Sequence, residues 1–206
     1  MINIENHYWI IGGSATEAYS SKSNTRVAQN DADFAAWKAS FAPTQIESEE
    51  ELAEVMRQYQ YLPRWLLNAP SFIQPSPDAY NKDQLKAYSD DARARKNNGG
   101  IVVNGIPFPS DMITLEALNA AYIYTQANLG STFSWKLPDG SFITLDKAQV
   151  EQLQAAVAKF GQDCFACEDA TATAIDGGSI TDLPGIDAAY DAVSNEFTST
   201  ITRRRK

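Results

Sequence analysis

The alternation of apolar and polar residues predicts short antiparallel strands in both halves of the chain. Residues 101–108 (IVVNGIPF) and residues 132–145 (TFSWKLPDGSFITL) each contain two apolar segments joined by a turn sequence. Gly105 and Gly140 occupy turn positions that need positive φ, where a residue with a Cβ atom is strained. A further small hairpin is expected within residues 8–28. We expect the two hairpins of the second half to share one antiparallel sheet.

Apolar residues three and four positions apart predict helices between these strands. Each helix is expected to begin at a polar capping residue. The first is expected to start near residue 32, and the others are expected to extend over residues 48–60, 81–97, 111–127, 146–174 and 183–197. The first helix is expected to bury Phe34, Trp37 and Phe41 on one face. A second core is expected where the strands meet the longest helix, formed by Phe133, Trp135, Phe142 and Phe160.

The helix predicted over residues 146–174 carries a heptad-like apolar seam. The seam consists of Val150, Leu153, Val157, Phe160, Cys164 and Cys167. An unbroken helix of this length extends about 40 Å, which is farther than a small sheet beside it can cover. We therefore predict that part of the seam contacts another protein chain, with Val157 as the candidate outward position.

These elements predict an α+β fold, in which small antiparallel hairpins pack with several helices, including one long helix. A chain of 206 residues can form one ordinary domain or two small ones. Residues 69–80 contain three prolines and no periodicity, which is typical of a linker. The predicted organisation is a small α+β attachment domain over residues 1–68, the linker, and a second α+β domain with the long helix over residues 81–206.

Composition and charge argue against two classes of partner. The hydrophobic content of 44% supports a packed core, while a formal net charge of −9 does not supply the basic face that nucleic-acid binding requires. No apolar run is long enough to span a membrane, and residues 1–11 lack the features of a signal peptide. We expect a protein that is made in the cytoplasm and binds neither nucleic acid nor membrane.

Few residues offer catalytic or metal-binding chemistry. His7 is the single histidine, so neither a Ser–His–Asp triad nor a two-histidine metal site can form within one chain. Cys164 and Cys167 lie inside the long helix rather than at its N-terminus, where a helix dipole would lower a thiol pKa, so reduced core residues are the better interpretation. No phosphate-binding loop or metalloprotease motif is present, and we expect no cofactor and no metal. A glycosidase carboxylate pair stays formally open among 26 acidic residues.

Two further features are candidate interfaces. Trp65 follows a proline–arginine pair in a loop-like segment and is the tryptophan expected to be exposed, where it could stack on a sugar or contact a protein. The chain ends in a basic tail on an acidic protein, formed by Arg203, Arg204, Arg205 and Lys206. This tail is interpreted either as a solvated terminus or as a docking segment for an acidic neighbour.

Several motifs follow one another in the second half of the chain. They are Arg93, Arg95 and Lys96 before GGIVVNGIPFPSD, then SWKLPDGSFITLDKAQV at residues 134–150 and CFACEDATATAID at residues 164–176. Together they resemble a domain of unknown function that is common in the tail genes of tailed bacteriophages and prophages, often beside or within tail-fibre genes. The first half, with HYWIIGG, EAYSSKSNTRV and DADFAAWKAS, is similar to the openings of phage tail-fibre-associated proteins. The resemblance implies no catalytic residue.

The resemblance implies a non-enzymatic structural component of the virion, attached to the tail fibre or baseplate and acting through interfaces with other tail proteins. Because tail parts repeat around symmetry axes, a homo-oligomer is expected, as a trimer or a multiple of three. A tail-fibre assembly chaperone that is absent from the mature particle is the alternative. A hydrolase or sugar-binding protein is a third hypothesis, distinguished by a solvent-open pair of carboxylates.

Overall fold

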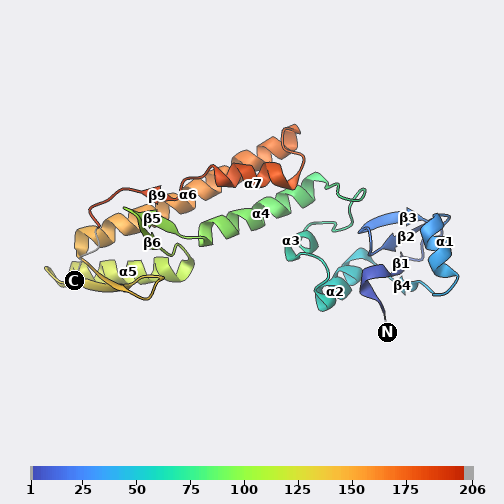
Figure 1. Ribbon diagram of the computed structural model, residues 1–206, viewed down its shortest axis with the longest axis horizontal. Helices are drawn as coiled ribbons and strands as arrows, with labels where there is room; N and C mark the ends of the chain where they lie inside the picture. The colour runs from blue at the N-terminus through green and yellow to red at the C-terminus, as the bar shows by residue number, and fades with distance from the viewer. Residues whose placement is uncertain (1, 202–206) are drawn as a thin grey trace. The chain divides into compact units, whose positions relative to one another are not determined.

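The computed structural model describes residues 2–201 of the chain. Within this part, seven α-helices and nine β-strands are present, and the strands form three small sheets (Figure 1). The predicted α+β class, with small hairpins and one long helix, is confirmed. Two compact units can be distinguished: the residues up to Asp90 with Ala174–Ile186, and Asp91–Thr173 with the described residues from Asp187 onward. We call them the first unit and the second unit.

The first unit is built on a mixed four-stranded sheet in the order β3-β2-β1-β4. Its strands are β1 (Tyr8–Ile11), β2 (Glu17–Ser20), β3 (Thr25–Ala28) and β4 (Thr44–Ile46). β2 and β3 form an antiparallel hairpin within the residues 8–28 where one was expected, and Asn24 in its turn has a φ of 52°. β4 pairs in parallel with β1, and a strand of three residues is too short to show a pattern in the sequence. Trp9 and Tyr19, from β1 and β2, are at most 1% exposed.

Three α-helices lie wholly within the first unit, one between β3 and β4 and two after β4. They are α1 (Ala32–Lys38), α2 (Glu49–Tyr59) and α3 (Arg64–Leu67). The first two begin at polar capping residues, as expected: the side chains of Asp31 and Ser48 each accept a backbone N–H of the first turn. Phe34 is fully buried, but the predicted burial of Phe41 is wrong: it lies beyond the end of α1 and is 61% exposed.

The segment predicted as a linker, residues 69–80, contains no helix or strand but packs into the first unit. Phe72 is 2% exposed and Ile73 is 6% exposed. The side-chain amide of Gln84 donates to the carbonyl oxygens of Ser71 and Ile73, at 3.0 Å each. These bonds, with an isolated bridge between Gln74 and Thr25, satisfy backbone groups in a segment that has no regular strand. The compact units therefore do not coincide with the domain boundary placed at this segment.

Both hairpins predicted for the second half are present in the second unit, in separate sheets. They are formed by β5 (Ile101–Val103) with β6 (Ile106–Phe108) and by β7 (Phe133–Lys136) with β8 (Phe142–Leu145). Gly105 has a φ of 75° and Gly140 a φ of 81°, which confirms both turn predictions. The expectation of one shared sheet is wrong, because the free edge of β5 pairs in parallel with β9 (Glu196–Phe197), far along the chain.

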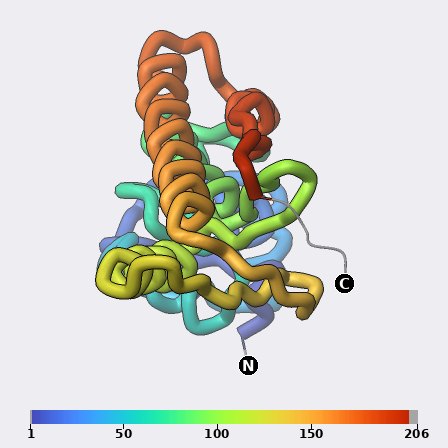
Figure 2. Tube along the Cα trace, turned by 90° about the vertical axis from the view of Figure 1, so that its left-hand side faces the viewer, coloured from blue at the N-terminus to red at the C-terminus, as the bar shows by residue number. Residues whose placement is uncertain are grey.

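Four further helices complete the described fold. They are α4 (Lys82–Asn98), α5 (Met112–Ala127), α6 (Lys147–Gly177) and α7 (Leu183–Asp191). With 31 residues, α6 is the predicted long helix, and it spans about 46 Å. In the second unit, α5 lies alongside the first part of α6 (Figure 2). The two run antiparallel, because Gln154 Nε2 donates to Asn119 Oδ1 at 2.5 Å and Lys147 Nζ to Gln126 Oε1 at 2.9 Å.

The chain itself covers the apolar seam of α6. Five of its six residues are at most 5% exposed, namely Val150, Leu153, Val157, Phe160 and Cys164. They belong to one core with apolar residues of β5, β6, α5, β7 and β8. The prediction that this seam needs another chain is wrong, because several short elements together cover a length of helix that one small sheet could not.

The core around β7 and β8 differs from the expected set at one aromatic residue. Trp135 is 7% exposed and Phe160 is fully buried, as predicted, but Phe142 is 65% exposed. Trp135 pairs with Ile143 across the hairpin, and Ile143 is buried. Since neighbouring residues of a strand point to opposite faces, Phe142 must point away from this core.

Candidate interaction surface

One face of α5 exposes a run of apolar side chains. We call it the α5 surface, and it consists of Met112, Ile113, Ala120, Ile123, Tyr124 and Ala127, with the exposed Glu116 among them. Its four large side chains are between 49% and 77% exposed, and Leu129, just beyond the helix, is 85% exposed. Single exposed apolar residues are ordinary, but a stripe of them along one helix face is typical of a contact site.

The other faces of α5 are occupied within the second unit. Leu118 and Ala121 are fully buried in its core. On the edge next to α6, Asn119 and Gln126 make the two side-chain hydrogen bonds described above. The carboxylate of Asp111 caps the helix by accepting the backbone N–H of Thr114 at 2.7 Å. The helix is thus held in place by its buried and polar faces, whereas its apolar outer face stays exposed among residues 2–201.

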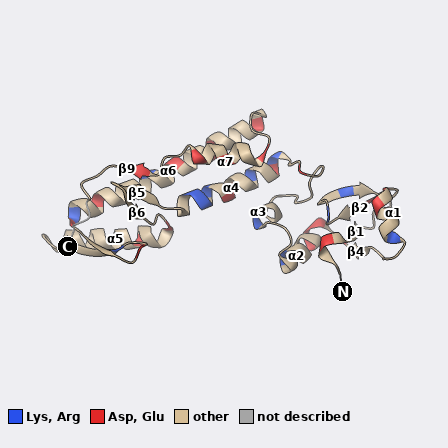
Figure 3. Ribbon diagram, viewed as in Figure 1, with Lys and Arg blue, Asp and Glu red and all other residues tan. Residues whose placement is uncertain are grey.

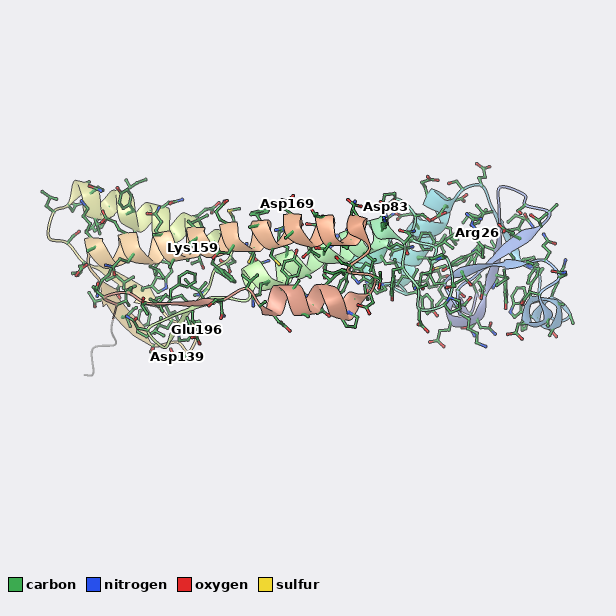
Figure 4. The ribbon with its side chains drawn as sticks, turned by 90° about the horizontal axis from the view of Figure 1, so that it is seen from above. Arg26, Asp83, Asp139, Lys159, Asp169 and Glu196 are labelled. Carbon is green, nitrogen blue, oxygen red and sulfur yellow. The ribbon has the colours of Figure 1, made fainter. Side chains whose placement is uncertain are left out.

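The α5 surface carries very little charge. Glu116 is the single charged residue of α5, and its ribbon is tan along most of its length in Figure 3. The exposed side of α6 is different, since Lys159 pairs there with Asp163 at 2.6 Å. Lys159 and Asp169 both lie on α6 (Figure 4). A partner that covers the α5 surface would therefore desolvate apolar side chains and one carboxylate.

The candidate interface residues named from the sequence lie elsewhere. Val157 is 5% exposed in the core of the second unit, so its assignment as an outward position is wrong. Trp65 lies in α3, not in a loop, and is half-buried, with its ring 5.0 Å from that of Tyr88 and 5.8 Å from that of Tyr80 between centroids. The predicted basic tail, Arg203 to Lys206, lies outside the described residues.

His7 is a packed residue of the first unit. It is 8% exposed, and its Nε2 lies 2.8 Å from the hydroxyl oxygen of Thr44. The rings of Trp9 and Trp37 meet the imidazole edge-on, with centroids at 4.4 and 5.2 Å. Burial lowers the pKa of His7, because it penalises the charged imidazolium. The neutral ring is therefore the form that this site stabilises.

The two cysteines of α6 are free thiols. Cys164 is fully buried, and burial raises the pKa of its thiol. Cys167 is half-buried, and its Sγ donates to the carbonyl oxygen of Ala189 at 3.5 Å. A raised thiol pKa is the opposite of what nucleophilic or redox chemistry requires. The geometry is that of small packed core residues.

Two open clefts are lined mainly by polar side chains. A groove of about 670 Å³ follows β3 in the first unit, where Lys22 and Asp33 are among its lining residues. A cleft of about 350 Å³ in the second unit is lined by residues that include Arg95 and Asp187. Each combines cationic and anionic groups, and so neither selects a ligand of one charge. Within residues 2–201, no three His, Cys, Asp or Glu side chains are grouped as a metal site. No helix among these residues is long and apolar enough to cross a membrane.

Sequence reasoning did not single out the α5 surface, although a signal for it was present. Residues 111–127 hold apolar side chains around most of the helix circumference, not on one stripe alone. A helix that packs on one side of a core buries about one apolar stripe, so the remainder has to be exposed or covered by a partner. Which residues form the remainder depends on how α5 is rotated against α6, and that rotation is a tertiary property.

Comparison with known proteins identifies one family. The sequence matches the family described as "Domain of unknown function (DUF4376)" over residues 80–194, which is more than half of the chain. The matched residues include α5 and both hairpins of the second unit. No curated protein and no solved structure matches the chain. The chain therefore belongs to the family of domains of unknown function DUF4376.

Proposed function

We propose that this protein is a non-enzymatic structural component of a bacteriophage tail, attached to the tail fibre or baseplate and present in the virion. The tail setting comes from the resemblance of its ordered motifs to proteins of phage tail genes. The single structural observation that supports a role through protein interfaces is the exposed α5 surface. In this proposal the protein works by contact, and its partners are other tail proteins.

The physical reason is the free energy of leaving apolar surface in water. Each large apolar side chain that a partner covers contributes roughly 1.5–3 kcal/mol when it becomes fully buried. The four large side chains of the α5 surface, at 49% to 77% exposure, can therefore supply several kilocalories per mole to an assembly. An isolated soluble domain gains nothing from such a stripe and risks aggregation, so an assembled role accounts for it better.

The test is the composition of purified phage particles. Virions from a phage or prophage that carries the gene are examined by quantitative mass spectrometry, and the protein is expected at a fixed copy number. If the fibre is the partner, that number is a multiple of three. Absence from the particles, combined with a requirement for fibre folding, would replace this proposal with the assembly-chaperone function, which an apolar client-binding surface also suits.

A matched pair of variants tests whether the α5 surface mediates incorporation. Tyr124 and Tyr59 are both tyrosines and both 49% exposed, but Tyr59 lies in α2 of the first unit. Tyr124→Lys is expected to reduce incorporation into virions, and Tyr59→Lys is expected to leave it unchanged. Equal incorporation of both variants would mean that incorporation into the tail does not depend on the α5 surface.

A further inference from the structure

We infer that the α5 surface pairs with the α5 surface of a second copy of this chain, in an antiparallel arrangement about a two-fold axis near Ala120. This inference gives a partner to the surface on which the proposed function rests, although pairing in solution can be tested without a phage. Three features of the surface support this pairing: its area, the order of large and small residues along it, and the position of its one charge.

The exposed area is of the size that a pair of copies needs. Five large apolar side chains at and just beyond the helix are between 49% and 85% exposed. Together they present on the order of 500 Å² of apolar surface. Two copies that bury this surface against each other reach about 1,000 Å² in total, which is the lower limit for a specific interface. A partner with a much smaller apolar face would leave part of the stripe in water.

The order of residues along α5 suits an antiparallel pair. When Ala120 lies on the two-fold axis, each residue faces the one at the same distance on the other side of Ala120 in the second helix. Ile113 then faces Ala127, seven residues on either side of the axis, so a large residue meets a small one. At the axis two alanines face each other, which allows the helices to approach closely.

The position of Glu116 favours the antiparallel over a parallel arrangement. In the antiparallel register Glu116 faces Tyr124, whose hydroxyl can donate a hydrogen bond to the carboxylate as water is excluded. In a parallel pair, or around a three-fold axis of parallel α5 helices, Glu116 would face its own copies. Like charges in a partly buried layer repel, and no basic residue of α5 is present to compensate for them.

The oligomeric state of the full chain tests the pairing. Analytical ultracentrifugation across the micromolar range is expected to show a dimer for the wild type and for Tyr59→Lys, and a monomer for Ile123→Lys. Circular dichroism before and after heating checks that each variant is folded. Because Ile123 is 67% exposed, its replacement by lysine leaves the core of the second unit intact. A monomeric or trimeric wild type, or a dimer that persists in folded Ile123→Lys, would overturn the inference.

Cross-linking tests the register directly. A residue on a two-fold axis meets its own copy, so Ala120→Cys is expected to form an intermolecular disulfide under mild oxidation. The background carries Cys167→Ser, which removes the half-buried native thiol. Lys159→Cys, on the exposed side of α6, is the control and is expected to cross-link far less. Equal cross-linking at both positions would overturn the antiparallel pairing.

The two tests also separate this inference from the proposed function. A dimer that cross-links through Ala120→Cys but is missing from virions would support the pairing and refute the tail function. A wild-type protein that is monomeric in solution but present in virions at fixed copy number would support the tail function and refute the pairing.

Discussion

The hairpin of β7 and β8 offers a sharp test of how the second unit is held together. Trp135 is 7% exposed, faces Ile143 across the hairpin and belongs to the core that covers α6. Trp135→Ala removes a large buried ring and leaves a cavity, which costs about 3–5 kcal/mol of unfolding free energy. Phe142→Ala is the matched control on the opposite face of the same hairpin. Since Phe142 is 65% exposed, the control should cost less than about 1 kcal/mol.

A second substitution at Trp135 separates its packing from its polar group. Its indole Nε1 is buried and has no hydrogen-bond partner among the described residues. Leaving such a donor unpaired costs about 1–3 kcal/mol, a cost that phenylalanine does not carry. The smaller ring loses some packing, so the two effects offset and Trp135→Phe should lie within about 1 kcal/mol of the wild type.

Urea denaturation followed by circular dichroism at one fixed temperature measures both variants and the control. The transition midpoints are comparable only where the slopes with denaturant agree. If Trp135→Ala cost no more than Phe142→Ala, the assignment of Trp135 to the core would be wrong. If Trp135→Phe were as destabilising as Trp135→Ala, the indole N–H would have to be hydrogen-bonded in the wild type, and its description as an unpaired donor would be wrong.

Three other predictions follow from local geometry. Gly100→Ala should lower the melting temperature more than Gly105→Ala, because both glycines have positive φ but only at Gly100 would a Cβ lie 2.9 Å from the carbonyl oxygen of Phe108. The free energy of unfolding should fall as the pH drops below about 6.5, because the histidine of the unfolded chain then binds a proton that the buried, neutral His7 of the folded chain does not. Urea titrations at pH 7.5 and pH 5 should therefore differ less for the His7→Gln variant than for the wild type. Asp146→Ala should cost about 0.5–2 kcal/mol in the same titrations by removing the acceptor for the backbone N–H of Gln149, and an unchanged midpoint would refute this cap.

Local chemistry accounts for the elements that the sequence predicts well. The turns at Gly105 and Gly140, and the helix starts at Asp31, Ser48 and Asp111, depend on residues within a few positions of each other. Positive φ and the capping of free backbone N–H groups are properties of such short segments. The long helix is predicted for the same reason, since its spacing of apolar residues is written along one continuous stretch.

The sequence does not predict which elements pair with one another, because these pairings join distant parts of the chain. Two residues of β9 complete the sheet of β5, and three residues of β4 extend the sheet of β1. Segments so short carry no periodic signal, and only the folded chain brings them to an open strand edge. The proline-rich residues 69–80 have the composition of a linker, but folding brings Phe72 and Ile73 into the core of the first unit.

The candidate site depended on tertiary structure most of all. The sequence showed two apolar helices, α5 and α6, and on length alone α6 was the one expected to need another chain. In the folded protein several short elements cover the seam of α6, including Val157, whereas α5 buries one face and leaves Met112, Ile113 and Ile123 in water. Periodicity determines that a helix has an apolar face, but which face is covered, and by what, is decided by the packing of segments that are far apart in the sequence.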